Sequence, residues 1–204
     1  MGRVEFRARD ISRLAEHERA REIARVYQDP LSGTCADLSI EENLALAATR
    51  GTRRGLRMAV TRTKRRLFAA YLAQFGLGLE ERLGERAGRL SGGQRQALAV
   101  LMAVARAPAV LLLDEHTAAL DPKNQIVLQE ITDEVVRDSG CTVMMVTHNM
   151  DHAIRHGDRM IMLHRGGIIF EAQGAEKRGL TIERLVSLFH KGRETVITDE
   201  MLLN

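Results

Sequence analysis

Short apolar runs alternate with amphipathic stretches along most of this chain. The runs at 109–113 and 142–146 lack the regular polar alternation of an exposed strand, so each predicts a strand buried in a parallel sheet. A shorter apolar run at 23–27 predicts a further strand. The stretch at 91–106 has the spacing of an amphipathic helix. Strands that alternate with helices in this way predict an α/β fold.

Caps, turns and breakers define the remaining elements. Ser39 is a suitable N-cap for a helix at 40–49, and Glu41 and Glu42 suit the positive end of that helix dipole. Pro122 predicts the first turn of another helix. The other predicted elements are a strand at 3–6, a loop with a short helix at 10–21, a loop at 31–39, a helix at 64–76 with a helical stretch on to 83, a short helix at 149–156, a hairpin of strands 159–164 and 168–171 around Gly166-Gly167, and a helix at 181–189.

Composition limits the class of protein. The 204 residues are 45% hydrophobic, which is enough to bury a sizeable core, and no apolar run approaches the roughly 20 residues that span a bilayer. Aromatic residues make up 3%, which argues against a surface that stacks bases. Cys35 and Cys141 form no CxxC motif and are interpreted as buried thiols in a reduced compartment, with a disulfide or a redox role as the alternative. The N-terminus does not resemble a signal peptide, so we expect a cytoplasmic protein, soluble or attached to a membrane partner.

Residues 50–66 form a basic run with no acidic residue. Its charged members are Arg50, Arg53, Arg54, Arg57, Arg62, Lys64, Arg65 and Arg66. Such a run can be a solvated arm, a surface for anionic lipid or a partner, or a contact for nucleic acid. The solvated arm is the simplest interpretation. With a net charge of only +3 over the whole chain, no nucleic-acid partner is expected.

Three motifs lie close together in the middle of the chain. Leu90–Gln96 reads LSGGQRQ, Ala109–Glu115 is an apolar run that ends in Asp-Glu, and Ala119–Asp121 reads ALD. In order and spacing these motifs resemble the signature loop, Walker B strand and D-loop of the ATP-binding-cassette (ABC) ATPases. The resemblance covers about residues 22–174.

This resemblance implies a fold and a domain organisation. It implies a P-loop NTPase-like α/β sheet flanked by helices, with an inserted α-helical subdomain at 31–89. Residues 1–204 would form one partial ABC ATPase domain, with a C-terminal helix and tail at 175–204. The expected ligands are ATP and Mg²⁺.

The resemblance also assigns roles at the ends of two strands. Asp114 would hold Mg²⁺, through water. Glu115 would act as the general base that polarises the attacking water. Gln28 comes after the strand at 23–27 and matches the Q-loop glutamine, which would bind Mg²⁺ and sense the γ-phosphate. Without the neighbouring motifs, an Asp-Glu pair would more often be two solvated acids, and one Gln would be a weak signal.

Further matched residues lie in loops. Ser91, Gly92, Gly93 and Gln94 form the signature turn, which in this family closes over the γ-phosphate of the ATP held by the opposite subunit. Exposed N–H groups at a helix N-terminus suit an anion. The D-loop carboxylate, which communicates across the dimer, matches Asp121.

Two histidines near these motifs have different expectations. His148 comes after the strand at 142–146 and matches the switch histidine that would contact the γ-phosphate. His116 stands where many family members have Pro, and it is expected to be a surface or packing residue. A second departure is Ala118-Ala119, where many members have Ser-Gly before Leu-Asp. Neither departing position carries the charge chemistry, so no loss of activity is expected.

One family motif is absent from these 204 residues. No G-x-x-x-x-G-K-[ST] occurs, although this loop holds the phosphates through its N–H groups and Lys. The first residues already match the part of the family domain that lies after this loop, so the domain is expected to be N-terminally truncated. An upstream true start and a real truncation both explain this. A real truncation would leave the chain with very weak ATP binding on its own.

The overall expectation is an ATP-binding and ATP-hydrolysing subunit of an ABC transporter. The segment 27–44 resembles ATPases of amino-acid importers, including the tryptophan/tyrosine type. The expected partners are a separate transmembrane permease, a second ATPase subunit in a head-to-tail homodimer, and a separate solute-binding protein, at the inner face of the cell membrane. The alternatives are a truncated, non-catalytic ABC fragment with a regulatory role and a soluble ABC ATPase outside transport.

Overall fold

The computed structural model describes residues 2–52 and 58–190. The chain forms two compact units, Met1–Val146 and Thr147–Asn204, and each is described by itself. The expected tail after residue 190, and Arg53, Arg54 and Arg57 of the basic run, lie outside the described residues.

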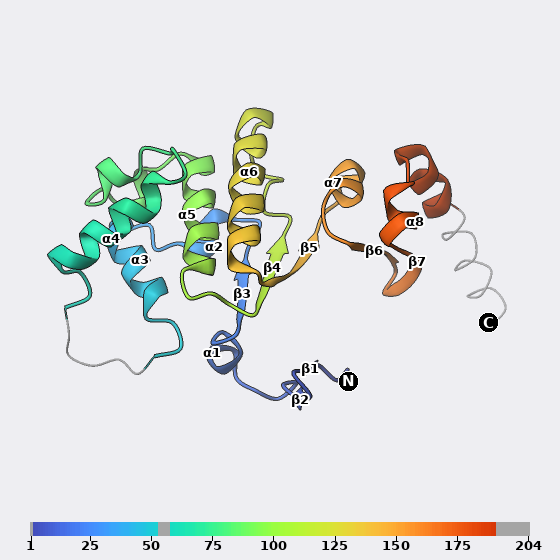
Figure 1. The fold of residues 1–204 in the computed structure, drawn as a ribbon, viewed down its shortest axis with the longest axis horizontal. Coiled ribbons are helices and arrows are strands. Elements are labelled where there is room, and N and C mark those ends of the chain that lie inside the picture. Colours follow the sequence, from blue (N-terminus) through green and yellow to red (C-terminus); the bar gives the residue numbers. More distant parts are fainter. Residues whose placement is uncertain (1, 53–57, 191–204) are drawn as a thin grey trace. The chain divides into compact units, whose positions relative to one another are not determined.

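A three-stranded parallel sheet organises the first unit. β3 (Ile23–Val26), β4 (Val110–Asp114) and β5 (Thr142–Val146) lie in the order β3-β4-β5 (Figure 1). All three predicted strands are present, in the α/β arrangement that the sequence pattern predicts. Because parallel strands end at the same sheet edge, the residues directly after β3 and β4 come together there.

Two helices cover the sheet. α5 (Gly92–Val104) contacts both β3 and α6 (Pro122–Ser139), and Figure 1 shows the two helices side by side. Their apolar side chains and those of β4 share one core. Among its fully buried members are Leu98, Leu101, Leu111, Leu113 and Leu128. The helix predicted at 91–106 and the Pro122 start are therefore confirmed.

Within the described part of the chain β5 is not a buried strand, so that prediction is wrong. Met144 and Val146 are 58% and 54% exposed. β5 is an edge strand with β4 as its described neighbour, so much of its surface stays open. Even β4 is fully buried only at Leu111 and Leu113, which face the helices.

A helical segment separates β3 from α5. It comprises α2 (Pro30–Gly33), α3 (Ile40–Ala48), α4 (Arg62–Ala73) and the 3₁₀ turns η1 (Glu80–Arg82) and η2 (Ala87–Arg89). Ser39 caps α3 as predicted: the Glu42 N–H donates to Ser39 Oγ at 3.3 Å, and the Ser39 N–H donates to Glu42 Oε2 at 2.7 Å.

Two details of this segment differ from the sequence prediction. The loop expected at 31–39 begins with α2, because Asp29 accepts the Leu31 N–H and Pro30 occupies the first helical turn. The helical stretch expected to reach residue 83 is only the short turn η1.

Tyr71 of α4 donates its hydroxyl to the Leu101 carbonyl at 3.1 Å, and burial raises the pKa of this phenol to about 12.

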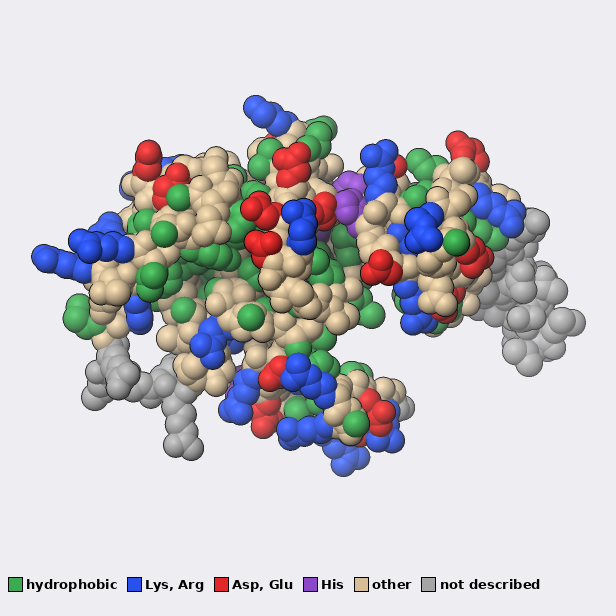
Figure 2. All heavy atoms as spheres, in the orientation of Figure 1, with side chains coloured by type: hydrophobic (Ala, Val, Ile, Leu, Met, Phe, Trp, Pro, Cys, Tyr) green, Lys and Arg blue, Asp and Glu red, His purple; other side chains and the backbone are tan. Residues whose placement is uncertain are grey.

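The thiol and basic-run expectations are also modified. Cys35 is exposed, so the interpretation of both cysteines as buried thiols is wrong, while Cys141 is half-buried. Arg65 pairs with Glu41 at 3.3 Å, and Lys64 donates to the Ala59 carbonyl at 2.9 Å. Figure 2 shows Lys and Arg side chains at the surface around α4.

The first unit begins with a small hairpin, β1 (Glu5–Phe6) and β2 (Arg9–Asp10), before α1 (Glu16–Arg19). The second strand was not predicted. The turn places Arg7 and Ala8 at φ values of 49° and 60°. Such turns normally carry Asn or Gly, so this sequence gives no hairpin signal.

The second unit contains α7 (Met150–Arg155), the hairpin β6 (Arg159–His164) and β7 (Gly167–Gln173), α8 (Gly174–Arg178) and a helix at 182–190. The predicted hairpin and flanking helices are confirmed, whereas α8 was missed. Lys177 of α8 is buried and donates to the carbonyls of Ile154 and His156 at 2.5 and 2.9 Å. Burial lowers the pKa of this amine.

Candidate functional site

The strand ends bring together three of the predicted site residues. Gln28 lies just after β3, Asp114 ends β4, and Glu115 comes next. Gln28 Nε2 donates to Glu115 Oε2 at 3.2 Å, although the two residues are 87 positions apart in the chain. An amide and two carboxylates therefore share the carboxyl edge of the sheet, where α/β proteins bind ligands.

Glu115 has an unusual backbone. Its φ of 44° lies in the left-handed region, which costs a non-glycine residue about 1–2 kcal/mol. Its N–H donates to the Val146 carbonyl at the end of β5, at 3.0 Å, which fixes the turn. Strand alternation does not set the direction of Glu115, because β4 already ends at Asp114. The left-handed turn determines where the Glu115 side chain points.

Arg25 is a site residue that the sequence pattern did not single out. From β3 it donates Nη2 to Asp114 Oδ2 at 2.6 Å, and its guanidinium lies over the Tyr27 ring, 4.5 Å from the centroid. The hydrogen bond to Asp114 raises the pKa of Arg25 above its ordinary value. A signal was available, because Arg25 is the one charged residue in the apolar run at 23–27.

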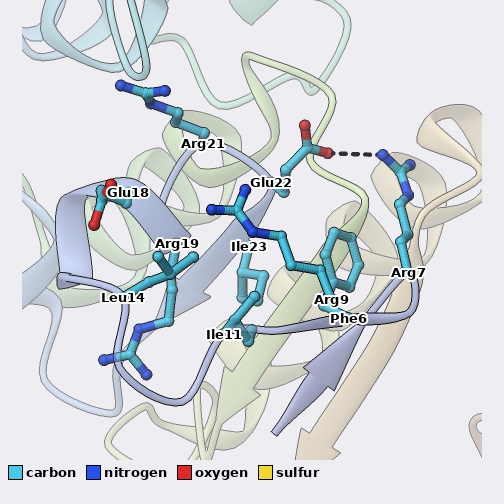
Figure 3. A pocket seen from close by; sticks show the side chains of 10 residues that line it. All are labelled: Phe6, Arg7, Arg9, Ile11, Leu14, Glu18, Arg19, Arg21, Glu22 and Ile23. Atoms are coloured by element: carbon cyan, nitrogen blue, oxygen red, sulfur yellow. Dashed lines mark hydrogen bonds and ion pairs between the residues drawn. The ribbon is translucent and has the colours of Figure 1, made fainter.

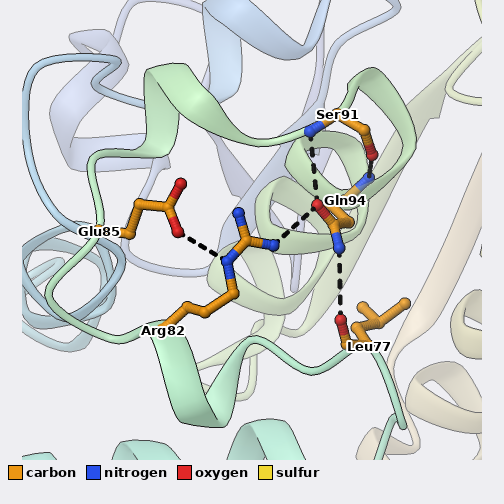
Figure 4. A network of polar contacts seen from close by, with 5 residues as sticks. All are labelled: Leu77, Arg82, Glu85, Ser91 and Gln94. Atoms are coloured by element: carbon orange, nitrogen blue, oxygen red, sulfur yellow. Dashed lines mark hydrogen bonds and ion pairs between the residues drawn. The ribbon is translucent and has the colours of Figure 1, made fainter.

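The signature turn is built as a capping box. The Gln94 N–H donates to Ser91 Oγ at 3.2 Å, and the Ser91 N–H donates to Gln94 Oε1 at 3.4 Å. Figure 4 shows that the Gln94 amide also meets Arg82 Nη1 at 3.5 Å and the Leu77 carbonyl at 3.4 Å. Arg82 is itself held by Glu85 at 2.6 Å. Gln94 therefore ties the turn to the helical segment.

Asp121 starts the helix beside this turn. Its carboxylate accepts the Asn124 N–H at 3.1 Å and Asn124 Nδ2 at 2.5 Å, and the first of these bonds does most to lower the pKa of Asp121. A Cβ placed on Gly93 would lie only 2.9 Å from Asn124 Cγ. The N-termini of α5 and α6 thus touch at Gly93 and Asn124.

This contact gives a testable prediction with an adjacent control. We expect Gly93→Ala to lower the free energy of unfolding by about 1–2 kcal/mol, because the clash outweighs the helix preference of Ala over Gly. Gly92→Ala should be neutral or stabilising, since its added Cβ would find Leu120 Cδ2 at an ordinary 3.7 Å. Urea unfolding followed by circular dichroism measures both. Equal effects of the two substitutions would show that Gly93 and Asn124 are not in contact.

The two histidines lie in different units. His116 is buried, and its Nε2 is 3.2 Å from Thr132 Oγ1. Because the Thr132 hydroxyl donates its proton to the Leu128 carbonyl, the His116 ring must be the donor, and His116 is a packing residue as expected. His148 is exposed in the second unit, directly before the α7 N-cap Asn149. Its contact with a phosphate stays a prediction.

A pocket of about 420 Å³ lies elsewhere in the first unit. Figure 3 shows it between the N-terminal hairpin, α1 and Ile23, which is the first residue of β3. Gln28 lies beyond the opposite end of the same strand, so this pocket is not part of the strand-end site. Within the described ranges, no three His, Cys, Asp or Glu side chains gather as metal ligands. No described helix is long and apolar enough to cross a membrane.

Comparisons with known proteins identify the family of this chain. The profile of the ABC transporter family matches residues 1–118. A tyrosine transport ATP-binding protein of Clostridioides difficile (strain R20291) is 42% identical over 188 residues, which are 92% of this chain and 74% of that protein. An aliphatic sulfonates import ATP-binding protein of Ralstonia nicotianae is 39% identical over 57% of this chain and 40% of its own length.

A solved structure supports the same assignment. An ATP-binding cassette, determined as a post-hydrolysis dimer with ADP and inorganic phosphate, superposes with a TM-score of 0.68 at 28% identity. The match covers 88% of this chain and 75% of that one. The fold and the family match define an ABC ATPase. The chain belongs to the ABC transporter family, as one of its ATP-binding subunits.

Proposed function

We propose that this chain is the ATP-hydrolysing subunit of an ABC importer for tyrosine or a related amino acid. The observation that carries the choice of solute is the 42% identity, over 92% of this chain, to a tyrosine transport ATP-binding protein. The importer would contain a separate transmembrane permease, a second copy of the ATPase subunit in head-to-tail contact, and a solute-binding protein. The chain would sit at the inner face of the cell membrane.

In this proposal Glu115 is the general base. Its carboxylate accepts a proton from the water that attacks the γ-phosphate, and the hydrogen bond from Gln28 holds it in place. Gln28 would sense the γ-phosphate from the same position. The rigid turn at Glu115 favours this role, because general-base catalysis depends on a fixed distance to the water.

Asp114 is the proposed Mg²⁺ ligand. Magnesium at nucleotide sites uses one or two carboxylates together with waters and phosphates, so the Asp114 carboxylate, acting through water, and the side-chain oxygen of Gln28 would suit this ion. The bound ion would neutralise phosphate charge. Arg25 already donates to Asp114 Oδ2, so this hydrogen bond would compete with the water through which Asp114 would hold Mg²⁺.

The signature turn would act on the nucleotide of the second subunit. Ser91 uses its hydroxyl oxygen as the acceptor of the Gln94 N–H, which leaves its proton available for a phosphate. Gly92 and Gly93 would bring backbone N–H groups close to the same anion. Asp121 would communicate across the dimer, and His148 would contact the γ-phosphate.

The proposed domain organisation is that of the same family. Residues 31–89 would form the helical insertion within one partial ABC ATPase domain over 1–204, and residues 175–204 would form a C-terminal helix and tail. These 204 residues include no phosphate-binding G-x-x-x-x-G-K-[ST] motif. The parts of the ATPase site that we assign to these residues are therefore the general base, the metal ligand and the signature turn.

Uptake by intact cells tests the proposed function. Deletion of the gene should abolish high-affinity uptake of radiolabelled tyrosine, and a plasmid copy should restore it. Uptake of an aliphatic sulfonate is the matched control, because a sulfonate importer ATPase is also similar to this chain. Loss of sulfonate uptake with intact tyrosine uptake would overturn the proposed solute class. If neither uptake changed, the importer assignment would be contradicted.

A further inference from the structure

Gln96 is a buried glutamine that the proposed chemistry does not use. It lies in the first half of α5 and is 1% exposed. Its Nε2 donates to the Tyr27 carbonyl at 2.8 Å, across 69 positions of the chain. Its Oε1 has no hydrogen-bond partner in the described residues.

A buried amide with an unsatisfied oxygen is costly, so a compensating role is expected. Rotation of the amide by 180° would not relieve it, because Oε1 would then face the Tyr27 carbonyl oxygen. The hydrogen bond from Gln96 Nε2 to the Tyr27 carbonyl therefore fixes the orientation of this amide. It ends on the carbonyl of the residue directly before Gln28.

The segment after β3 contacts α5 at a second point. A Cβ placed on Gly33 of α2 would lie 2.9 Å from the Ala99 Cβ, so these two elements pack with no room between them. Asp29 and Pro30 fix the start of α2 between the two contacts. Residues 27–33 are thus held against α5 at both ends.

We infer that Gln96 is a positioning residue that fixes Gln28 against Glu115 by binding the Tyr27 carbonyl. Through this bond, a displacement of the signature helix α5 moves the Gln28 side chain at the strand-end site. The physical link is short: one side-chain hydrogen bond, one peptide, and then the Gln28–Glu115 hydrogen bond at 3.2 Å. The meaning of this link for catalysis rests on the proposed function, whereas the link itself does not.

Gln96→Met tests this link in the entire chain, with no nucleotide added. Met has nearly the volume of Gln but cannot donate to the Tyr27 carbonyl. We expect amide hydrogen exchange at Leu31 and Ser32, whose N–H groups bond to Asp29, to accelerate about tenfold, which corresponds to one lost hydrogen bond. The NMR signals of the Gln28 side-chain amide should also shift.

Gln129→Met is the matched control. Gln129 likewise has a buried Oε1 with no described partner and one Nε2 bond, but that bond goes to Asp133 on its own helix, at 2.9 Å. This variant should leave Leu31, Ser32 and the Gln28 amide unchanged. If a folded Gln96→Met protein also left them unchanged, the inference would be overturned.

A measurement on the unsubstituted chain covers the case in which Gln96→Met does not fold. A scalar coupling across the hydrogen bond from Gln96 Nε2 to the Tyr27 carbonyl carbon is expected in the NMR spectrum, and its absence would overturn the inference. In the assembled transporter, Gln96→Met should lower kcat for ATP with little change in KM. If the gene deletion showed the expected uptake defect but the NMR signals were unchanged in Gln96→Met, the link would be refuted and the proposed function would stand.

Discussion

Glu115→Gln is expected to reduce ATP hydrolysis by about 10²–10⁴-fold, the usual contribution of a positioned general base. The amide oxygen of the new side chain can still accept from Gln28 Nε2, so the substitution removes the charge and the basicity while the hydrogen bond is kept. The measurement is steady-state ATP hydrolysis by the transporter complex, purified from native membranes through a tag on this chain.

Glu130→Gln is the control for this substitution. Glu130 is exposed on α6, away from the strand ends, and its neutralisation changes the net charge equally. Hydrolysis should then stay within about twofold of the unchanged complex, as is usual for surface substitutions. If Glu115→Gln reduced the rate of hydrolysis by less than tenfold, the general base would be another group.

Leu98→Ala is expected to lower the free energy of unfolding more than any of the other substitutions proposed for this chain. Leu98 is fully buried in α5 and belongs to the core shared with β4 and α6. Truncation of a buried Leu costs about 2–5 kcal/mol, because transfer energy is lost and a cavity remains. This is a large share of the roughly 5–15 kcal/mol that stabilises a typical domain. Urea unfolding, monitored through the helix signal in circular dichroism, measures the change.

Leu67→Ala is the matched control, because Leu67 is 62% exposed on α4. It should change the free energy of unfolding by no more than about 0.5 kcal/mol. Similar losses in the two variants would mean that Leu98 is not part of the buried core. Hydrolysis by the assembled complex should fall in Leu98→Ala only as far as folded protein is lost.

Some parts of the fold escaped prediction because they depend on weak local signals. The hairpin turn at Arg7 and Ala8 adopts left-handed backbone without Asn or Gly, so no residue type marks it. The exposure of β5 depends on how many strands lie beside it, which a run of apolar residues does not reveal. Cys35 was misjudged for a similar reason, since residue type gives only an average burial.

The sequence by itself determined the features that short-range interactions control. The Ser39 and Ser91 capping boxes join residues three apart, and the Asp121 cap with Pro122 starts α6 in the same way. Each such signal lies within one helical turn, so it can be read without knowledge of the fold. The consecutive motifs from Leu90 to Asp121 likewise indicated the family that the comparisons show.

Only the tertiary structure decided which distant residues meet. Arg25 pairs with Asp114, Gln28 with Glu115, and Gln96 with the Tyr27 carbonyl, across 89, 87 and 69 positions. The physical reason is that a hydrogen bond requires atoms to approach within about 3 Å, and over such separations the packing of α5 and the strands sets that distance. The sequence supplied the site's chemical groups, and the packing of the sheet and helices gave them their partners.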